Sequence, residues 1–460
     1  MISADRPRTS ARPAVLLAYA APAVASSFLF TAVSLYLLKF STDVLLVAPA
    51  SVGLIFAVGR FWDAFTDPVV GQLSDRTRTR LGRRRPWLLG SALPVAATYL
   101  AVWSPPAGLP EAQLVLWMGA AILGFYTAIT AFSVPHRALG AELAAGYHDR
   151  TRVFGAKAFG DHVGIVLGAA SLLHLENAAQ PRQAAACVAA LAGAMMIAGT
   201  LRATAALREP PGHQGRGGCK RSHAAFVDVL RNREARILVA VLFLEMLGYQ
   251  TFVTMLPYLT EYVLETPGAT AYYLFGAIAT TLATLPAWAP LSRRFGKARV
   301  WAASLGVKTV VFAGMAFVGP GDWPGIALLT GVFGAVTGAG AVLGPSLEAD
   351  VVDSQEADTG ERKEGAFFAA SGLAIKAATG LAILISGALL SGIGFRPNVA
   401  QTPAALLGIR ATVSVLPVSC HLLAMTLLAR LGMDEAESAD VRRRIHELPS
   451  VARLRQDGAR

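Results

Sequence analysis

Residues 59–87, GRFWDAFTDPVVGQLSDRTRTRLGRRRPW, decide the fold. Two carboxylates, Asp63 and Asp67, lie in the apolar first half of this stretch, and a hairpin rich in arginine follows at once. On a helix, residues four apart share one face, so two like charges repel unless a cation or proton lies between them. An ionised carboxylate near the middle of a bilayer also costs about 2.5–3.5 kcal/mol on insertion scales. We therefore expect this pair to hold a positive charge.

The composition of the chain indicates a membrane protein. Of its 460 residues 54% are hydrophobic and 15% are charged, whereas a soluble domain carries about 25% charged residues. The net charge of +11 does not indicate nucleic acid, because the basic residues fall in short runs between apolar segments. The three cysteines, Cys187, Cys219 and Cys420, lack metal-ligand spacing and are expected to be free thiols. With neither a catalytic constellation nor a phosphate loop, we expect no enzyme and no cofactor.

Apolar windows of about 20 residues predict the membrane-crossing helices. The first window is not followed by a small-residue cleavage site, so we expect it to be retained as a helix. The twelve windows are residues 14–38, 50–74, 86–104, 112–136, 153–174, 184–206, 236–259, 270–291, 300–318, 324–348, 366–391 and 405–429.

These windows predict an all-α polytopic membrane protein with twelve transmembrane helices in two six-helix lobes. A linker rich in glycine, proline and basic residues separates the lobes. The predicted segments are a cytoplasmic N-terminus at 1–13, lobes at 14–207 and 235–429, the linker at 208–234 and a cytoplasmic tail at 430–460. Basic residues concentrate after every second window, which places both termini in the cytoplasm and the protein in the cell membrane.

Two short motifs recur in the two halves. GQLSDRTRTRLGRRRP at 71–86 is matched by APLSRRFGKAR at 289–299, and VPHRALGAEL at 134–143 is matched more weakly by GPSLEADVVD at 344–353. Each pair falls at the same place in its half. Such repeats are typical of a two-lobed transporter whose site lies near the middle of the membrane.

Four segments resemble a known family. They are DAFTDPVVGQLSDRTRTRLGRRRPW at 63–87, YTAITAFSVPHRALGAEL at 126–143, GYHDRTRVFG at 146–155 and DTGERKEGAFFAASGLAIK at 358–376. Together they resemble the glycoside-pentoside-hexuronide:cation symporters, the melibiose-permease-like branch of the major facilitator superfamily. The resemblance covers nearly the whole chain and implies the major facilitator fold.

The resemblance implies a cation site. In the family the helix-two carboxylates, here Asp63 and Asp67, bind the coupling cation together with the residue before the second one, here Thr66. A helix-four threonine adds a ligand, which is Thr130 or, as the alternative, Thr127. Oxygen-only ligation suits Na⁺. Because the family often has asparagine where this chain has Thr66, a proton remains the alternative coupling ion.

The resemblance also implies residues near the solute. Lys376 matches a helix-eleven lysine that lies near both substrate and cation in the family, and Arg60 matches a family arginine that would pair with Asp63 on one helix face. Galactoside carriers clamp sugar hydroxyls with two aspartates, but this chain has Ser27 and Ser133 there. Galactoside recognition of that type is therefore not expected.

Two more polar groups are candidates for the solute site. Lys157 and Asp161 are four residues apart, so they either neutralise each other or line the cavity. Glu245 lies one turn before Tyr249 and Gln250. These three residues bind a cationic or polyhydroxylated solute, or else Glu245 holds helices together.

The arginine hairpin predicts a cytoplasmic gate. Its arginines can bind acidic groups and helix C-terminal carbonyls and so close the cytoplasmic side. The predicted gate residues are Asp75, Arg76, Arg83, Arg84, Arg85, Glu142, Arg150, Arg152 and Arg362. The basic tail is either an amphipathic helix on anionic membrane lipid or a solvated segment.

We expect a monomeric symporter that moves a small polyhydroxylated solute, such as a glycoside, pentoside or uronate, with Na⁺ or H⁺ by alternating access. One alternative is a transporter or exporter of an amphiphile, either a lysolipid or a hydrophobic metabolite, because the family has lipid-moving relatives and the sugar aspartates are missing. The other is a non-transporting membrane receptor or scaffold. Asp63, Asp67 and Lys376 argue against the scaffold, which needs no intramembrane cation site.

Overall fold

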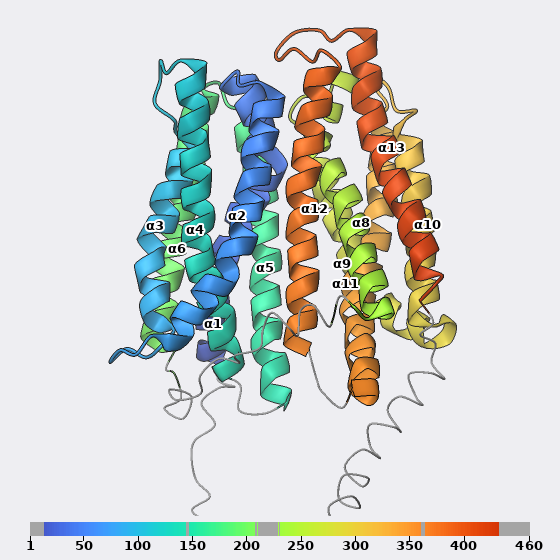
Figure 1. The fold of residues 1–460 in the computed structure, drawn as a ribbon. Helices are drawn as coiled ribbons and strands as arrows, with labels where there is room; N and C mark the ends of the chain where they lie inside the picture. Colours follow the sequence, from blue (N-terminus) through green and yellow to red (C-terminus); the bar gives the residue numbers. More distant parts are fainter. Residues whose placement is uncertain are drawn as a thin grey trace, which may run out of the picture. The chain divides into compact units, whose positions relative to one another are not determined.

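The computed structural model describes residues 13–143, 147–207, 209, 229, 231–359 and 364–431. Over these residues the chain forms twelve α-helices and two π-helical turns, with no strand (Figure 1). It divides into two compact units. The first comprises Met1–Gly218, Pro267–Ala271 and Ile383–Gln401, and the second comprises Cys219–Thr266, Tyr272–Ala382 and Thr402–Arg460. The predicted all-α fold is confirmed.

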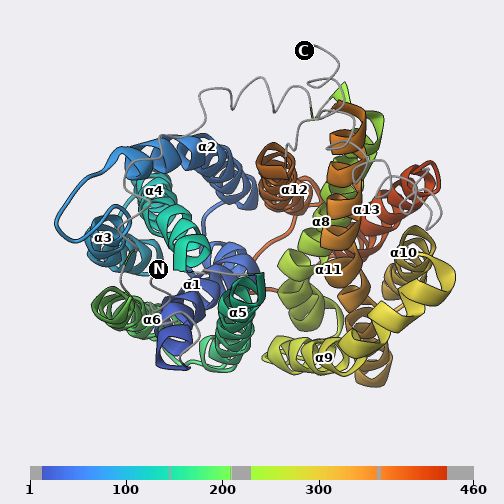
Figure 2. The same cartoon turned by 90° about the horizontal axis from the view of Figure 1, so that it is seen from below.

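Six helices of the first unit pack in a defined order. α1 packs along α5 and α6, α3 packs on α4 and α6, and α2 packs on α4 (Figure 2). Proline stands in the first turn of α2, α3 and α6, where its missing N–H has no helical partner to lose. The bounds are α1 Pro13–Lys39, α2 Pro49–Arg76, α3 Arg85–Trp103, α4 Glu111–Leu143, α5 Tyr147–Glu176 and α6 Pro181–Ala206.

In the second unit α13 packs on α8 and α10, and α10 packs on α11. The side chains of Asn232 and Thr402 accept backbone N–H groups at the starts of α8 and α13, at 2.9 and 3.2 Å. α12 crosses the division, since its residues from Ile383 onward belong to the first unit. The bounds are α8 Arg233–Tyr258, α9 Thr270–Phe295, α10 Lys297–Met315, α11 Trp323–Thr359, α12 Glu364–Gly392 and α13 Pro403–Leu428.

A structural repeat relates the first helix of each half. A π-helical turn follows α1 at Phe40–Val44, and another follows α8 at Leu259–Val263. Each turn leads to a residue with left-handed backbone, Leu46 at φ 58° and Glu265 at φ 56°. Because such backbone is uncommon outside glycine, its recurrence supports the duplication that the two sequence motifs indicate.

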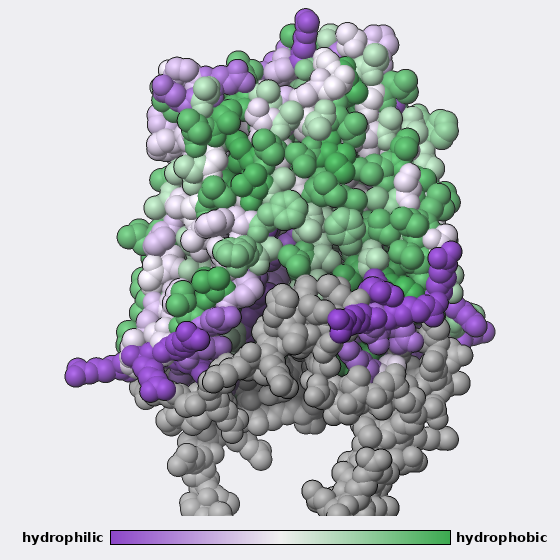
Figure 3. Space-filling model, in the orientation of Figure 1, coloured by the Kyte–Doolittle hydropathy of each residue, from purple (hydrophilic) through white to green (hydrophobic). Residues whose placement is uncertain are grey.

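Ten of the described helices are long and apolar enough to cross a membrane. α2 and α10 are outside this set. Both carry charges along their length, including Arg60, Asp63 and Asp67 in α2 and Lys308 in α10. Apolar side chains cover the middle of the helices on the face that Figure 3 shows, and hydrophilic side chains gather towards their ends. The chain is therefore a multi-pass membrane protein.

A row of glycines lets α5 approach α1 closely. Gly160, Gly164 and Gly168 are spaced four residues apart, and a Cβ atom placed on Gly164 would lie 2.8 Å from the Cβ of Ser27. Small residues at this spacing allow helix backbones to pack closely within membranes. The close packing brings Asp161 of α5 beside Ser27 of α1.

Candidate cation and solute site

Asp63 is a buried carboxylate held between two helices. Thr130 of α4 donates its hydroxyl proton to Oδ1 of Asp63 at 2.5 Å, and Thr66 donates to the Asp63 backbone carbonyl at 3.2 Å. Thr127, the alternative helix-four threonine, donates to Leu123 O and accepts Trp62 Nε1 at 2.8 Å. The structure thus places Thr130 against the Asp63 carboxylate.

Arg60 is held mainly by aromatic rings. Its guanidinium lies over the rings of Phe30 and Tyr126, at 5.4 and 4.9 Å from the centroids, and 4.0 Å from Oδ2 of Asp63. A cation over an aromatic face is attracted by the ring quadrupole. Gly59 makes this arrangement fit, because a Cβ atom there would lie 2.8 Å from the Tyr126 ring. Arg60 is therefore kept close to Asp63 without a short ion pair.

Asp67 lies one helical turn after Asp63 and faces a cation from α4. Its Oδ2 is 3.9 Å from the guanidinium of Arg137, whose Nε donates to the Ser133 carbonyl at 3.4 Å. Sequence reasoning missed Arg137 as a site residue. Its signal was its place one turn after Ser133 in a motif that already matched the family.

A second charged pair joins α5 to α1. Lys157 donates to Oδ2 of Asp161 at 2.6 Å, and Ser27 donates to Oδ1 of the same carboxylate at 2.9 Å. The side chains of Lys157 and Asp161 remain 24% and 28% exposed, so a solute can still reach them. Asp161 thus brings a carboxylate to Ser27, the position where galactoside carriers have a helix-one aspartate.

A buried ring stack joins α1 to α4. His136 and Tyr19 stack with their ring centroids 4.4 Å apart, and the Tyr19 hydroxyl donates to the His136 carbonyl at 3.3 Å.

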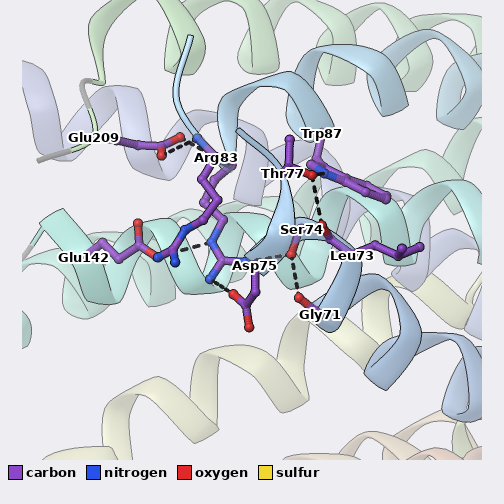
Figure 4. Close-up of polar contacts among 10 residues, drawn as sticks. Gly71, Leu73, Ser74, Asp75, Thr77, Arg83, Trp87, Glu142 and Glu209 are labelled. Atoms are coloured by element: carbon purple, nitrogen blue, oxygen red, sulfur yellow. Dashed lines mark hydrogen bonds and ion pairs between the residues drawn. The ribbon is translucent and has the colours of Figure 1, made fainter. Parts of the chain in front are cut away.

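The predicted gate residues form a network at the end of α2 (Figure 4). The guanidinium of Arg84 donates to Asp75, to Ser74 Oγ at 2.6 Å and, through Nε, to Glu142 Oε1 at 3.2 Å. Arg83 donates to the same Glu142 oxygen at 2.5 Å. Four of the predicted gate residues, from α2, the hairpin and α4, therefore come together.

Glu209 completes this network from the linker side. Its carboxylate accepts the backbone N–H groups of Arg83, Arg84 and Arg85 at 2.6, 2.7 and 2.9 Å. These amides lie at the start of α3, where a helix favours negative charge. Sequence reasoning missed Glu209, because nothing in the local sequence shows which amides it binds.

The structure gives less information on the five other predicted gate residues. Arg85 donates to the carbonyls of Leu81 and Thr204. Arg76 and Arg152 are exposed. The side chain of Arg150 and the whole of Arg362 lie outside the described residues.

In the second unit Glu245 is bound from two directions. Lys308 of α10 donates to its Oε1 at 2.5 Å, and Trp301 Nε1 donates to Oε2 at 2.9 Å. Tyr249 stacks on Phe333 at 6.0 Å, and Gln250 donates to the Thr254 hydroxyl at 3.1 Å. Lys376 lies half-buried on α12.

The donor set of the first unit fits a hard cation. Asp63, Asp67 and Thr130 supply only oxygen atoms, the ligand type that alkali ions prefer. Across the described residues no group of three or more His, Cys, Asp and Glu side chains could hold a metal ion. Cys187 and Cys420 are free thiols, and Cys219 lies outside the described part of the chain.

The fold and its intramembrane charges define a class, a multi-pass transporter with two duplicated halves. The family described as MFS/sugar transport protein matches residues 18–435, and the chain belongs to this family. The predicted resemblance to the glycoside-pentoside-hexuronide:cation symporters of the major facilitator superfamily is confirmed. The protein is therefore a transporter of the symporter type and takes a small-molecule substrate.

Three relatives illustrate the family to which the chain belongs. The chain is 25% identical to the uncharacterised symporter YnaJ of Bacillus subtilis, over 94% of each chain. It is 24% identical to the putative sulfoquinovose importer of Salmonella typhimurium, over 85% of this chain and 83% of the relative. A shorter match, 35% identical, is to the sodium-dependent lysophosphatidylcholine symporter 1 of Xenopus tropicalis, and spans 30% of this chain and 26% of the relative.

Solved structures show the same fold. The nucleoside transporter NupG superposes with a TM-score of 0.66 at 13% identity, covering 91% of this chain and 100% of NupG. At this identity the likeness shows the fold alone.

Proposed function

We propose that this protein is a symporter that couples a cation at Asp63 and Asp67 to the movement of a small polyhydroxylated solute. One observation carries the proposal: Asp63 is buried on α2, bonded to Thr130 of α4, and has the guanidinium of Arg60 at 4.0 Å. A carboxylate in this setting retains affinity for a small cation. Acids inside membrane-spanning segments are rare, and they typically mark ion pathways or substrate sites.

The coupling follows from linkage between the two ligands. A cation between Asp63 and Asp67 removes their mutual repulsion and favours the form of the site that binds solute. By reciprocity, solute must then raise the affinity for the cation by the same factor. Alternating access by movement of the two six-helix halves would carry both across the membrane, with the Asp75–Arg84 network opening and closing the cytoplasmic side. In this proposal the protein is a monomer of the cell membrane with both termini in the cytoplasm.

Na⁺ is the coupling ion that we favour. The oxygen-only donor set supports it, and so does the similarity to a sodium-dependent symporter. A proton on Asp63 would serve the same electrostatic purpose and is the alternative.

A second candidate solute is an amphiphile. The match to the lysophosphatidylcholine symporter supports it, as do Ser27 and Ser133 in place of the sugar aspartates. The sulfoquinovose importer matches a much larger share of the chain and supports a sugar. A receptor or scaffold without transport is the remaining alternative, which solute flux into proteoliposomes would exclude.

The decisive experiment replaces the two carboxylates. Asp63→Asn and Asp67→Asn variants in proteoliposomes are expected to lose solute uptake driven by a cation gradient, because neither amide can attract the ion. Glu111→Gln removes an exposed carboxylate from the first turn of α4 and is the matched control, expected to keep full uptake. Full gradient-driven uptake by both aspartate variants would falsify the proposal.

A further inference from the structure

We propose that a groove between α3 and α4 holds an acyl chain of an anionic phospholipid, whose phosphate is bound by three outer arginines of the α2–α3 hairpin. The outer arginines are Arg76, Arg78 and Arg80. In the orientation proposed above, the occupant is a lipid of the cytoplasmic leaflet and is not the transported solute. The inference depends neither on the coupling ion nor on the solute.

The groove is built by small residues on two neighbouring helices. It measures about 550 Å³, and its lining runs from Pro86 to Thr98 on α3 and from Gly124 to Ala131 on α4. Gly90 leaves open space, since a Cβ atom placed there would meet nothing within 4 Å among the described residues beyond its own helical turn. Ligand sites usually have volumes of about 300–1,000 Å³. The groove is therefore large enough for a ligand.

The wall of the groove is apolar. Its three hydroxyls, those of Ser91, Thr98 and Thr127, each donate to a carbonyl one turn back in their own helix at 2.7 Å. The remaining lining residues are prolines, glycines, alanines and Trp87. Because polar groups lose free energy where they find no hydrogen-bond partner, such a wall favours a hydrocarbon chain over a polyhydroxylated solute.

The groove opens towards the lipid. α3 is an apolar membrane span at the edge of the first unit, packed on α4 and α6 (Figure 2). The lining residues Gly90 and Pro94 are exposed, and Leu93 between them is 68% exposed. An exposed leucine in such a span is suited to contact lipid tails, which are equally apolar.

The length of the groove matches one leaflet of a bilayer. Pro86 and Thr98 are twelve residues apart on α3, which corresponds to about 18 Å at the helical rise of about 1.5 Å per residue. One leaflet contributes about 15 Å of hydrocarbon, half of the usual core of about 30 Å. An acyl chain that enters beside Pro86 at the membrane surface would therefore follow the groove to the middle of the bilayer.

Positive charge lies at the surface end of the groove. Trp87 Nε1 donates to Thr77 Oγ1 at 2.8 Å, so the groove begins beside the residue that separates Arg76 from Arg78 (Figure 4). All three outer arginines are exposed. Within the described part of the chain, none of them forms an ion pair.

The hairpin arginines thus fall into two groups. Arg83 and Arg84 are buried and bind Glu142, and Arg84 also binds Asp75. The outer arginines keep their charges available for an external anion. Basic residues on the cytoplasmic side of a membrane span attract anionic lipid, by about 5-fold in affinity for each arginine. The groove and the outer arginines therefore match the two parts of an anionic phospholipid, a hydrocarbon chain and a phosphate.

Native mass spectrometry of the purified protein in detergent tests this site. The probes are phosphatidylglycerol and phosphatidylethanolamine with the same acyl chains, so that the head groups differ mainly in net charge. We expect phosphatidylglycerol to form a one-lipid complex with about 10-fold higher affinity, since several arginines act on its negative charge. Equal affinities for the two lipids would overturn the anionic head group.

A first pair of variants tests the groove. Gly90→Leu should weaken the binding of phosphatidylglycerol about 10-fold, because each CH₂ group displaced from the groove lowers affinity about 4-fold. Gly119→Leu, at a position of α4 that is equally open but outside the lining, is the matched control and should bind like the wild type. Leucine favours a helix over glycine, so neither variant weakens its helix.

A second pair of variants tests the head-group contacts. Arg78→Gln with Arg80→Gln should remove most of the preference for phosphatidylglycerol. Arg293→Gln with Arg294→Gln, which replaces two exposed arginines at the end of α9, is the matched control and should keep the preference. Equal losses in the two double variants would mean that the arginines act only through net charge and would overturn the site.

Two further results would also overturn the inference. If Gly90→Leu binds phosphatidylglycerol like the wild type, the chain does not lie in this groove. If the protein forms a dimer that Gly90→Leu dissociates, a second copy of the chain occupies the groove. Asp63→Asn should bind the lipid like the wild type, so failure of the proposed cation site would leave the lipid result intact.

Discussion

Glu245 in the second unit and the two aspartates of α2 in the first unit differ in how closely they contact their basic partners. In the second unit Glu245 lies 2.5 Å from Lys308, the side chains are 12% and 3% exposed, and the other Glu245 oxygen takes the Trp301 N–H. In the first unit Asp63 and Asp67 meet their arginines only at 4.0 and 3.9 Å.

This difference separates a structural pair from pairs that a ligand can use. A buried charge needs its partner at short range, because desolvation otherwise dominates. Lys308 is the short-range partner of Glu245, so a solute that binds Glu245 would first have to break this existing ion pair. Asp63 and Asp67 contact Arg60 and Arg137 only at long range, so an external cation could compete with these two arginines. Glu245 stays a prediction as a solute ligand, but its oxygens are already occupied.

The largest expected effect comes from breaking the tight pair. Lys308→Met leaves the Glu245 carboxylate buried without its cation, and removing one partner of a buried pair costs about 3–5 kcal/mol. We expect this loss in the free energy of unfolding, measured by denaturation of the purified protein in detergent.

The double variant Lys308→Met with Glu245→Gln is the control for that loss. It removes both charges and should recover most of the stability. If the single variant were as stable as the wild type, the pair would not be structural, and the contrast between the two units would be lost.

The next effect concerns the loose pairs and appears in ion binding. Thr130→Val removes the hydroxyl that bonds Asp63 at 2.5 Å and is expected to weaken Na⁺ binding about 10-fold, since a hydrogen bond to a charged group contributes about 1.5–3 kcal/mol. The midpoint of a Na⁺ thermal-shift titration measures it. Thr127→Val, whose hydroxyl bonds Trp62, is the matched control and should change the midpoint by less than about 2-fold. Equal effects of the two variants would mean that Thr130 is not part of the cation site.

The helices could be predicted because an apolar window of sufficient length is by itself enough to indicate a helix that lies in lipid. All twelve windows correspond to described helices. The errors lie at helix ends, where polar residues continue a helix beyond the bilayer. α4 runs to Leu143 and α11 to Thr359, past windows that end at 136 and 348.

The site was predictable only as far as local motifs reach. Asp63 and Asp67 stand out because acids in an apolar helix are rare, and Thr130 came from the family pattern. Arg137, Glu209 and Lys308 were missed. Their contacts join residues far apart in the chain, 126 positions in the case of Glu209 and Arg83, and no local pattern encodes such distances.

A smaller effect is expected at the gate, where Glu209 resembles Glu245 in having its oxygens occupied. Glu209→Gln keeps the size of the side chain but removes the negative charge at the start of α3. We expect a loss of about 1 kcal/mol in the free energy of unfolding, as for other charges at helix ends. Glu111→Gln, at the exposed start of α4, is the control and should cost less. An unchanged stability would mean that the three amides are satisfied equally well by a neutral oxygen.

The smallest effect is expected at Ser27, which donates a hydrogen bond to Asp161 of the Lys157–Asp161 pair. Ser27→Ala removes one part-buried hydrogen bond, but Asp161 keeps Lys157 at 2.6 Å, so the loss of unfolding free energy should stay below about 1 kcal/mol. The Na⁺ midpoint without solute should not move, because Asp67 is untouched. Solute affinity should fall, because Asp161 is then less firmly placed. Ser26→Ala, which removes a hydroxyl bonded to the Pro22 carbonyl of its own helix, is the control. If Ser27→Ala shifted the Na⁺ midpoint as much as Thr130→Val does, the cation and solute groups would form a single site.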